Sequence, residues 1–390
     1  MSGHGDEPPS PEELAGVFRV AAIDRADDTV RYFGEPLGRP DDVVEQLRPQ
    51  FTQAGYSLTL ERQAGDQPDE GRHLVPRANQ YALVAEPRDT GSVPWLNVVL
   101  LAVTIASTLF VGASSWYYIP VTEAPLRLLE AWPFAAAMLG VLGIHELGHY
   151  AAARYHGVDV TLPYFIPFPS LLGTMGAVIN IRGRIPSRRA LFDIGVAGPL
   201  AGLVATVVVT LVGFTLDPIQ VPESVQSGGA EYAISFHDPL LMQGLEALVT
   251  GLGVGVQIGP GEAVHPVVFA GWAGMFFTFL NLLPVGQLDG GHIVRAIVGQ
   301  RQETVAAAVP GGLFALAGFL YLTQDAPPAG FGIWALWAFW GLLAIGFAYA
   351  GPARPTVDEP LDRRRTLLGV ATFLFGLACF SPIPFEIVAA

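Results

Sequence analysis

The segment HELGH places two imidazoles and a carboxylate within five residues, at His145, Glu146 and His149. On a helix, positions i and i+4 lie on one face, so both imidazoles can bind a single Zn²⁺ while the carboxylate between them reaches the water on that ion. This arrangement is typical of a metalloprotease, in which the glutamate acts as the general base. A polar contact between helices or a proton relay is the alternative interpretation of the same residues.

Two histidines leave the site short of ligands, because a catalytic zinc normally has three protein ligands and a water. Asp289 is the natural third ligand, since Pro284 interrupts the preceding helix and the two glycines that follow Asp289 let the backbone bend. His292 is the competing ligand, three positions further on. The sequence therefore predicts one Zn²⁺ per chain, held by His145, His149 and Asp289.

The composition indicates that these residues lie in a membrane protein. Of the 390 residues, 51% are apolar and only 14% are charged, against about 25% charged in soluble domains. From Val93 onward the apolar residues form stretches of about twenty, each long enough to cross a bilayer core of about 30 Å. The expected spans lie near 95–118, 132–154, 190–214, 265–284, 304–323, 331–350 and 366–386. An ionisable side chain inside a span costs several kcal/mol unless it is paired, ligated or functional, so the HELGH segment in the second span favours a functional site.

One apolar segment is unlike a simple span. Residues 159–181 contain three prolines and alternate like strands, which predicts a re-entrant loop or a β-hairpin. The stretch 174–182, which overlaps its end, offers an edge to which an unwound substrate segment could add as a strand. A packed re-entrant loop without that role is the alternative.

The charged residues are concentrated before the first span. Residues 1–15 are polar and rich in proline, which predicts a disordered tail. Residues 16–90 are expected to form a small soluble α/β domain, with a strand pair over 18–24 and 29–34, a helix over 41–55 and two later strands. The fold class is thus an α-helical polytopic membrane protein of about six to seven spans (93–390), with a catalytic core over 130–300 and a soluble N-terminal domain.

The distribution of the arginines predicts which side of the membrane each connection between spans faces. If the N-terminal domain is cytoplasmic and the spans alternate, Arg127 alone lies on the outer side and the other arginines lie inside, as the positive-inside rule requires. The expected location is therefore the cell membrane, with the lipid bilayer as a partner. The net charge of −14 argues against a nucleic-acid partner.

Two distant motifs together resemble one family. HELGH in one span and NLLPVGQLDGG in a later one are similar to the motifs of the site-2 proteases, the intramembrane zinc metalloproteases of peptidase family M50. Gly198 and Pro199 resemble the Gly-Pro segment of that family. The stretch GTMGAVINIRGRIPSRRALFDI is closest to the subgroup with a soluble N-terminal region, which includes plant chloroplast members.

The resemblance implies regulated intramembrane proteolysis, with a membrane-spanning protein as substrate. It assigns the zinc ligands His145, His149 and Asp289 and the acid/base Glu146, in agreement with the residue chemistry. It also places Asn281 near the substrate carbonyl, whereas the residue alone fits an interhelical hydrogen bond equally well. A metal or proton transporter that uses the same His/Glu/Asp cluster is the competing function.

Overall fold

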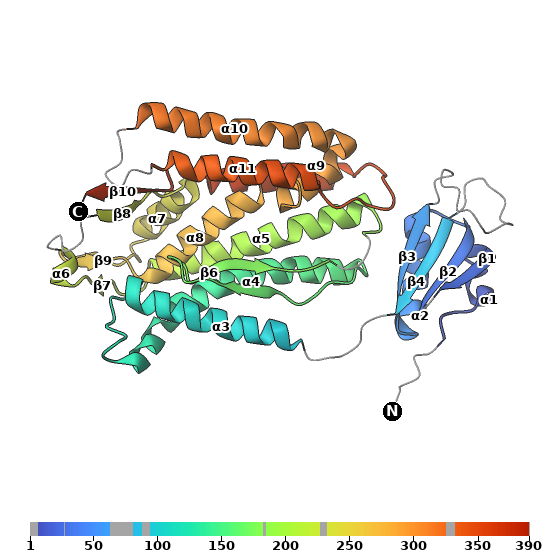
Figure 1. The fold of residues 1–390 in the computed structure, drawn as a ribbon, viewed down its shortest axis with the longest axis horizontal. Helices are drawn as coiled ribbons and strands as arrows, with labels where there is room; N and C mark the ends of the chain where they lie inside the picture. The colour runs from blue at the N-terminus through green and yellow to red at the C-terminus, as the bar shows by residue number, and fades with distance from the viewer. Residues whose placement is uncertain are drawn as a thin grey trace.

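The computed structural model describes residues 7–26, 28–62, 81–87, 94–181, 185–226, 232–324 and 332–389. A small antiparallel sheet near the N-terminus is followed by a bundle of long helices (Figure 1). The other strands that the structure describes belong to three two-stranded sheets. The described part of the chain is therefore mostly helical.

The N-terminal sheet has four antiparallel strands in the order β1-β2-β4-β3. Their bounds are Phe18–Ala26 (β1), Thr29–Pro36 (β2), Tyr56–Arg62 (β3) and Tyr81–Pro87 (β4). Helix α2 (Pro40–Gln53) packs against the sheet and buries Leu47 and Phe51 in a shared apolar core. The predicted strand pair over 18–24 and 29–34 is confirmed by the register of β1 and β2.

The expected disordered tail over 1–15 is wrong for the part of it that the structure describes. Pro11–Leu14 form a short helix, α1, with proline in its first turn. Leu14 is fully buried in the core under the sheet, and the hydroxyl of Tyr32 donates to the carbonyl of Pro9 at 2.7 Å. These contacts order a segment whose composition alone predicts disorder. Residues 1–6 lie outside the described residues.

The helical bundle begins with α3. Its main helices are α3 (Trp95–Val111), α4 (Trp132–Tyr155), α5 (Arg188–Gly213), α7 (Leu240–Gly251), α8 (Pro266–Asn281), α9 (Asp289–Val298), α10 (Gln302–Thr323), α11 (Trp334–Ala350) and α12 (Arg363–Ala378). Four helical stretches of the described chain are long and apolar enough to cross a membrane: Trp95–Trp116, Pro125–Tyr155, Arg188–Gly213 and Asp289–Thr323. They indicate a polytopic membrane protein.

Three expected spans differ from the helices observed. Those near 265–284 and 331–350 coincide with α8 and α11, which are apolar but shorter than a simple span. The span expected over 366–386 is wrong in its second half, because α12 ends at Ala378 and residues Phe385–Ala389 form strand β10. Prolines in SPIP (381–384) explain the end of the helix, since proline cannot continue a helix. Strand β10 pairs with β8 (Tyr232–Phe236).

The proline-rich segment after α4 is a β-hairpin, as one of its two predicted forms required. Strands β5 (Tyr164–Pro167) and β6 (Thr174–Val178) pair in antiparallel fashion. Helix α3 holds the hairpin, because Asn97 donates from Nδ2 to the carbonyl of Leu162 at 2.8 Å. Trp116, in the π-helical turn that extends α3, donates from Nε1 to the carbonyl of Leu171 at 3.0 Å.

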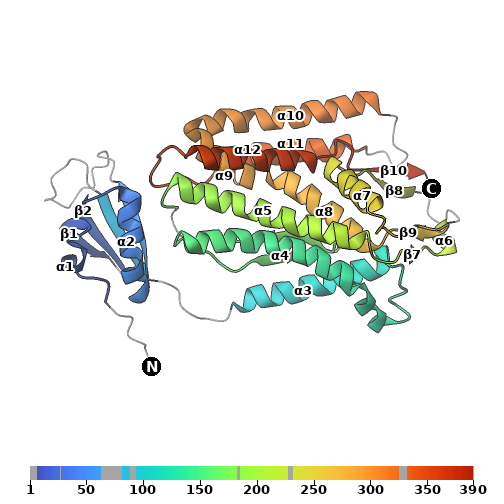
Figure 2. The ribbon, with the colours of Figure 1, turned by 180° about the vertical axis from the view of Figure 1, so that it is seen from behind.

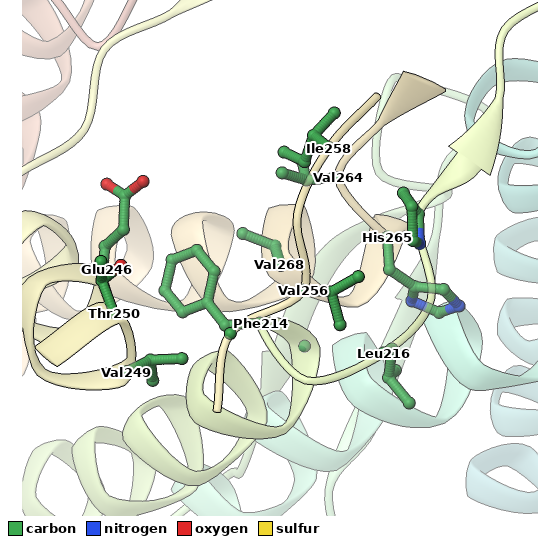
Figure 3. Close-up of a pocket in the computed structure, with 13 residues that line it drawn as sticks. Phe214, Leu216, Glu246, Val249, Thr250, Val256, Ile258, Val264, His265 and Val268 are labelled. Atoms are coloured by element: carbon green, nitrogen blue, oxygen red, sulfur yellow. The ribbon is translucent and has the colours of Figure 1, made fainter. Parts of the chain in front are cut away.

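A cavity of about 80 Å³ (Figure 3) is bordered by α7, which lies at the end of the bundle remote from the N-terminal sheet in Figure 1. Apolar side chains from the end of α5, from α7, from the loop before α8 and from the start of α8 form most of its wall, among them Phe214, Val249 and Val268. His265 borders it. With a single imidazole in its wall, this cavity lacks the cluster of ligands expected for the metal site.

Candidate active site

Three side chains from two distant segments meet in the middle of the bundle. His145 Nε2 lies 3.1 Å from Asp289 Oδ2, and His149 Nε2 lies 3.2 Å from Asp289 Oδ1. The two Nε2 atoms are 3.1 Å apart. Both imidazoles are buried, and the Asp289 side chain is 16% exposed. Within the described residues, these three form the one group of His, Cys, Asp or Glu side chains that could hold a metal ion.

Helix α4 positions both imidazoles. The spacing of four residues sets them on one face, with ring centroids 4.9 Å apart. Ile144, just before the motif, and Leu147, within it, are 46% and 49% exposed. The face of α4 that carries the two imidazoles therefore turns inward, while Ile144 and Leu147 lie on an exposed face.

Helix α5 fixes the rings from the other side. The Nδ1 of His149 lies 2.7 Å from the carbonyl oxygen of Ile194. Because a carbonyl only accepts, Nδ1 carries the proton and Nε2 is free to bind a metal. Gly198 lies directly against the His149 ring, and a Cβ at Gly202 would lie 2.8 Å from His145 Nδ1. Only glycine at these two positions lets α5 approach the imidazoles so closely.

A short loop between α8 and α9 delivers the carboxylate. Pro284 lies in this loop, and Asp289 is the first residue of α9. The expected reason for the two glycines after Asp289 is wrong, because neither Gly290 nor Gly291 has a positive φ. A Cβ at either position would instead collide with the backbone of residues 282–286. The glycines allow α9 to pack against its own preceding loop, and this packing sets Asp289 at the cluster.

The remaining candidates line one cavity with the cluster. Its volume is about 220 Å³, and Glu146, Asn281 and His292 all contribute to its wall. Asn281 Nδ2 lies 3.4 Å from His145 Nε2. His292 donates from Nδ1 to the carbonyl of Leu288 at 3.1 Å and is outside the group that could share an ion. The geometry thus favours Asp289 over His292 as the third ligand.

The donor set fits a zinc ion. Imidazole nitrogens and carboxylate oxygens are the ligands that catalytic zinc takes, and tetrahedral bonds of about 2.0–2.1 Å place neighbouring ligand atoms about 3.3 Å apart. The separations observed between the three side chains, 3.1 and 3.2 Å, are close to that value. Without a cation, the Nε2 of His149, which is left unprotonated by the hydrogen bond at Nδ1, would face the Asp289 carboxylate oxygen as a second acceptor.

Two contributions were missed in the sequence. One is the hydrogen bond from His149 to the main-chain carbonyl of Ile194, and the other is the close packing of Gly202 against His145. Neither involves a side chain whose chemistry marks it in the sequence. The signal available was the spacing of small residues, since Gly198 and Gly202 lie four positions apart and so share a helix face. That face is the one that meets α4.

A family model for peptidase family M50 matches residues 133–323 of the chain, which contain all the clustered residues. This part of the chain belongs to peptidase family M50. The resemblance of the two motifs to site-2 proteases is thereby confirmed. The M50 region begins with α4 and ends with α10, so it includes α5, α8 and α9 as well.

Several curated plant proteins are similar to the chain. The chain is 31% identical over 266 residues to a probable zinc metalloprotease EGY2, chloroplastic, of Oryza sativa subsp. indica, covering 67% of this chain and 44% of the relative. It is 27% identical over 384 residues to the protein of the same name from Arabidopsis thaliana, and the match covers 94% of this chain and 63% of the relative. It is 29% identical over 386 residues to a probable zinc metalloprotease EGY1, chloroplastic, of Arabidopsis thaliana, and the match covers 89% of this chain and 65% of the relative. The chain thus spans between 44% and 65% of the length of these relatives. No solved structure matches it.

Proposed function

We propose that this protein is an intramembrane zinc metalloprotease that hydrolyses peptide bonds in the membrane-spanning segments of other proteins. The observation that carries the proposal is the meeting of the HELGH imidazoles with Asp289, a residue from a different helix, in a cavity that also contains Glu146. The names of the plant relatives support it.

The proposed ligands are His145, His149 and Asp289, for one Zn²⁺ per chain. Zinc bound there would polarise the scissile carbonyl and lower the pKa of a water molecule to about 7. Glu146 lies in the cavity that the three ligands border, so it can accept the proton of the attacking water and deliver it to the leaving amine. The amide of Asn281 is proposed to donate to the substrate carbonyl oxygen as negative charge develops there.

The hairpin offers a way to present an extended substrate. A peptide bond in a helix is hydrogen-bonded internally, so the substrate helix must unwind before cleavage. Ala177, Val178 and Ile179, at the end of β6, line the cavity. Within the described residues β6 pairs with β5 only. We propose that an unwound substrate segment adds to β6 as a third strand and so lies across the cavity.

The proposed orientation places the N-terminal sheet in the cytoplasm and the protein in the cell membrane. Arg39, before α2, pairs with Glu359 at 3.3 Å, and Arg48 donates from Nη1 to the carbonyl of Tyr155 at 3.3 Å. The sheet therefore meets the same end of the bundle as the arginine-rich start of α12 (Figure 2). An excess of arginine on one side is typical of the cytoplasmic side.

The test is Glu146→Gln in the full chain, reconstituted with a single-span substrate. The amide should still allow zinc to bind while removing the proton acceptor, so we expect one zinc per chain and loss of cleavage by at least about 10²-fold. Glu303→Gln, which removes an exposed carboxylate from the first turn of α10, is the matched control and should cleave normally. Metal-dependent ion flux across the membrane without any cleavage would contradict the proposal and support the metal or proton transporter instead.

A further inference from the structure

A segment of ten residues between α11 and α12 lies next to the wall of the active-site cavity. We call residues 353–362 the strap. Its Thr356 and Val357 donate from their backbone amides to the carbonyls of Ile185 and Pro186, at 2.9 and 3.1 Å. Ile185 belongs to the wall of the cavity. The strap is therefore fixed to the chain segment that leads from the cavity into α5.

Asp358 in the strap contacts two helices of the site. Its Oδ1 lies 3.5 Å from Arg188 Nη1 at the start of α5, and its Oδ2 lies 3.6 Å from Arg295 Nη2 in α9. The arginine side chains are only 8% and 10% exposed. Two guanidinium groups so close together and so poorly hydrated repel one another unless an anion lies between them. Among the described residues, the carboxylate that pairs with both is that of Asp358.

Arg188 also joins the two helices directly. It donates from Nε to the carbonyl of Ala296 and from Nη2 to the carbonyl of Ile297, both at 2.8 Å. These are carbonyls of the last turn of α9, which a cation stabilises. The start of α5 is thus bound to the end of α9.

The same two helices set the geometry of the metal cluster. The first residue of α9 is Asp289, about 10 Å along the helix from Ala296 at 1.5 Å per residue. Helix α5 carries the Ile194 carbonyl that accepts from His149. A small rotation of α9 against α5 therefore changes the distance between the Asp289 carboxylate and the imidazoles. Shifts well below 1 Å matter for a metal site of fixed geometry.

We propose that Asp358 is a positioning residue for the active site: its carboxylate bridges Arg188 and Arg295, locks α9 against α5 and so holds Asp289 at coordinating distance from the two histidines. This inference rests on the proposed function, since it concerns the same metal site. It assigns a role at the active site to the strap, which lies outside the 133–323 family match.

The neighbouring residue supplies a matched control. Glu359 pairs with Arg39 at 3.3 Å, with both side chains about half exposed. It carries the same charge in the same strap, and the pair that it forms involves neither α5 nor α9. Neutralising Glu359 therefore measures the general effect of removing a strap carboxylate, and the difference between the two variants measures the bridge.

The experiment compares purified full-length wild type with Asp358→Asn, Asp358→Glu and Glu359→Gln. Three quantities are measured: the zinc dissociation constant by competition with a chelator, kcat and KM on a single-span peptide, and the thermal midpoint of the metal-stripped protein. We expect Asp358→Asn to weaken zinc binding about 10-fold or more, as loss of an outer-shell partner does, and to lower kcat with KM little changed. Because Asp358→Asn leaves the two guanidinium groups without their shared anion, the metal-stripped midpoint should also fall, Asp358→Glu should recover most of the affinity, and Glu359→Gln should match wild type.

Wild-type zinc affinity and kcat in Asp358→Asn would overturn the inference, and so would equal losses in Asp358→Asn and Glu359→Gln. If Asp358→Asn does not fold, Arg295→Gln removes the other end of the same bridge, and the same two outcomes are decisive for it. Zinc binding by wild type without any cleavage would contradict the proposed function, and the zinc affinities would still test the role of Asp358.

Discussion

His149 donates its Nδ1 proton to the backbone carbonyl of Ile194, at 2.7 Å. This hydrogen bond decides which ring nitrogen faces the cluster, because the other nitrogen, Nε2, is left without a proton. Histidine ligands to metals usually have such a partner, and it also fixes the plane of the ring. Here the partner is a main-chain group of α5, so the ligand depends on how closely α5 approaches α4.

The close approach can be tested at Gly198. A Cβ there would overlap the His149 ring, so Gly198→Ala must push α5 and α4 apart or rotate the imidazole. Overpacking of this kind costs about 1–3 kcal/mol of stability, and we expect zinc affinity and cleavage to fall at least about tenfold. Gly140→Ala in α4 is the control, since a Cβ there has open space around it. If Gly198→Ala binds zinc as tightly as Gly140→Ala does, the proposed role of α5 is wrong.

A variant of Asn281 can distinguish a catalytic role of this residue from a structural one. If its amide donates to the substrate carbonyl, Asn281→Ala should lower kcat about 10²–10³-fold, as removal of one oxyanion donor does, with zinc content unchanged. If Asn281 only forms an interhelical hydrogen bond, the variant should lower the thermal midpoint and leave kcat nearly intact. Measuring kcat and the midpoint on the same preparations distinguishes the two roles.

The edge of β6 can be tested with proline. Val178 is the last residue of this strand and lines the cavity, and proline there removes a backbone donor and resists pairing. We expect Val178→Pro to reduce cleavage with zinc content unchanged. Val178→Ala, which shortens the side chain but keeps the N–H, should retain most of the activity. Equal cleavage by the two variants would exclude strand addition at this residue.

The chemistry of the site was predictable from the sequence because its residues are rare in membrane spans. The HELGH spacing predicts two imidazoles on one helix face, and the structure has them there. Asp289 was predicted as their partner from a distant motif, and it lies within 3.2 Å of both rings. Composition also predicted the helical, membrane-spanning character, and the alternation over 159–181 predicted a re-entrant loop or a β-hairpin, of which the hairpin is observed.

Other features depend on tertiary packing that periodicity does not encode. The apolar stretch over 366–386 has the length of a span, yet its end pairs as β10 with a strand 150 residues earlier in the chain. The composition of the proline-rich start predicts disorder, but Leu14 packs in the core of the N-terminal sheet and orders the segment around it. Asp358 looks like one of several loop carboxylates, and only the fold brings Arg188 and Arg295 to it.

The zinc content of two single variants, Asp289→Ala and His292→Ala, tests the central claim most directly. Both side chains line the same cavity and both can bind zinc, but only Asp289 lies in the cluster with His145 and His149. Elemental analysis of the purified proteins should give about one zinc per chain for His292→Ala, as for wild type, and a large loss for Asp289→Ala. Full zinc content in Asp289→Ala together with loss in His292→Ala would contradict the account.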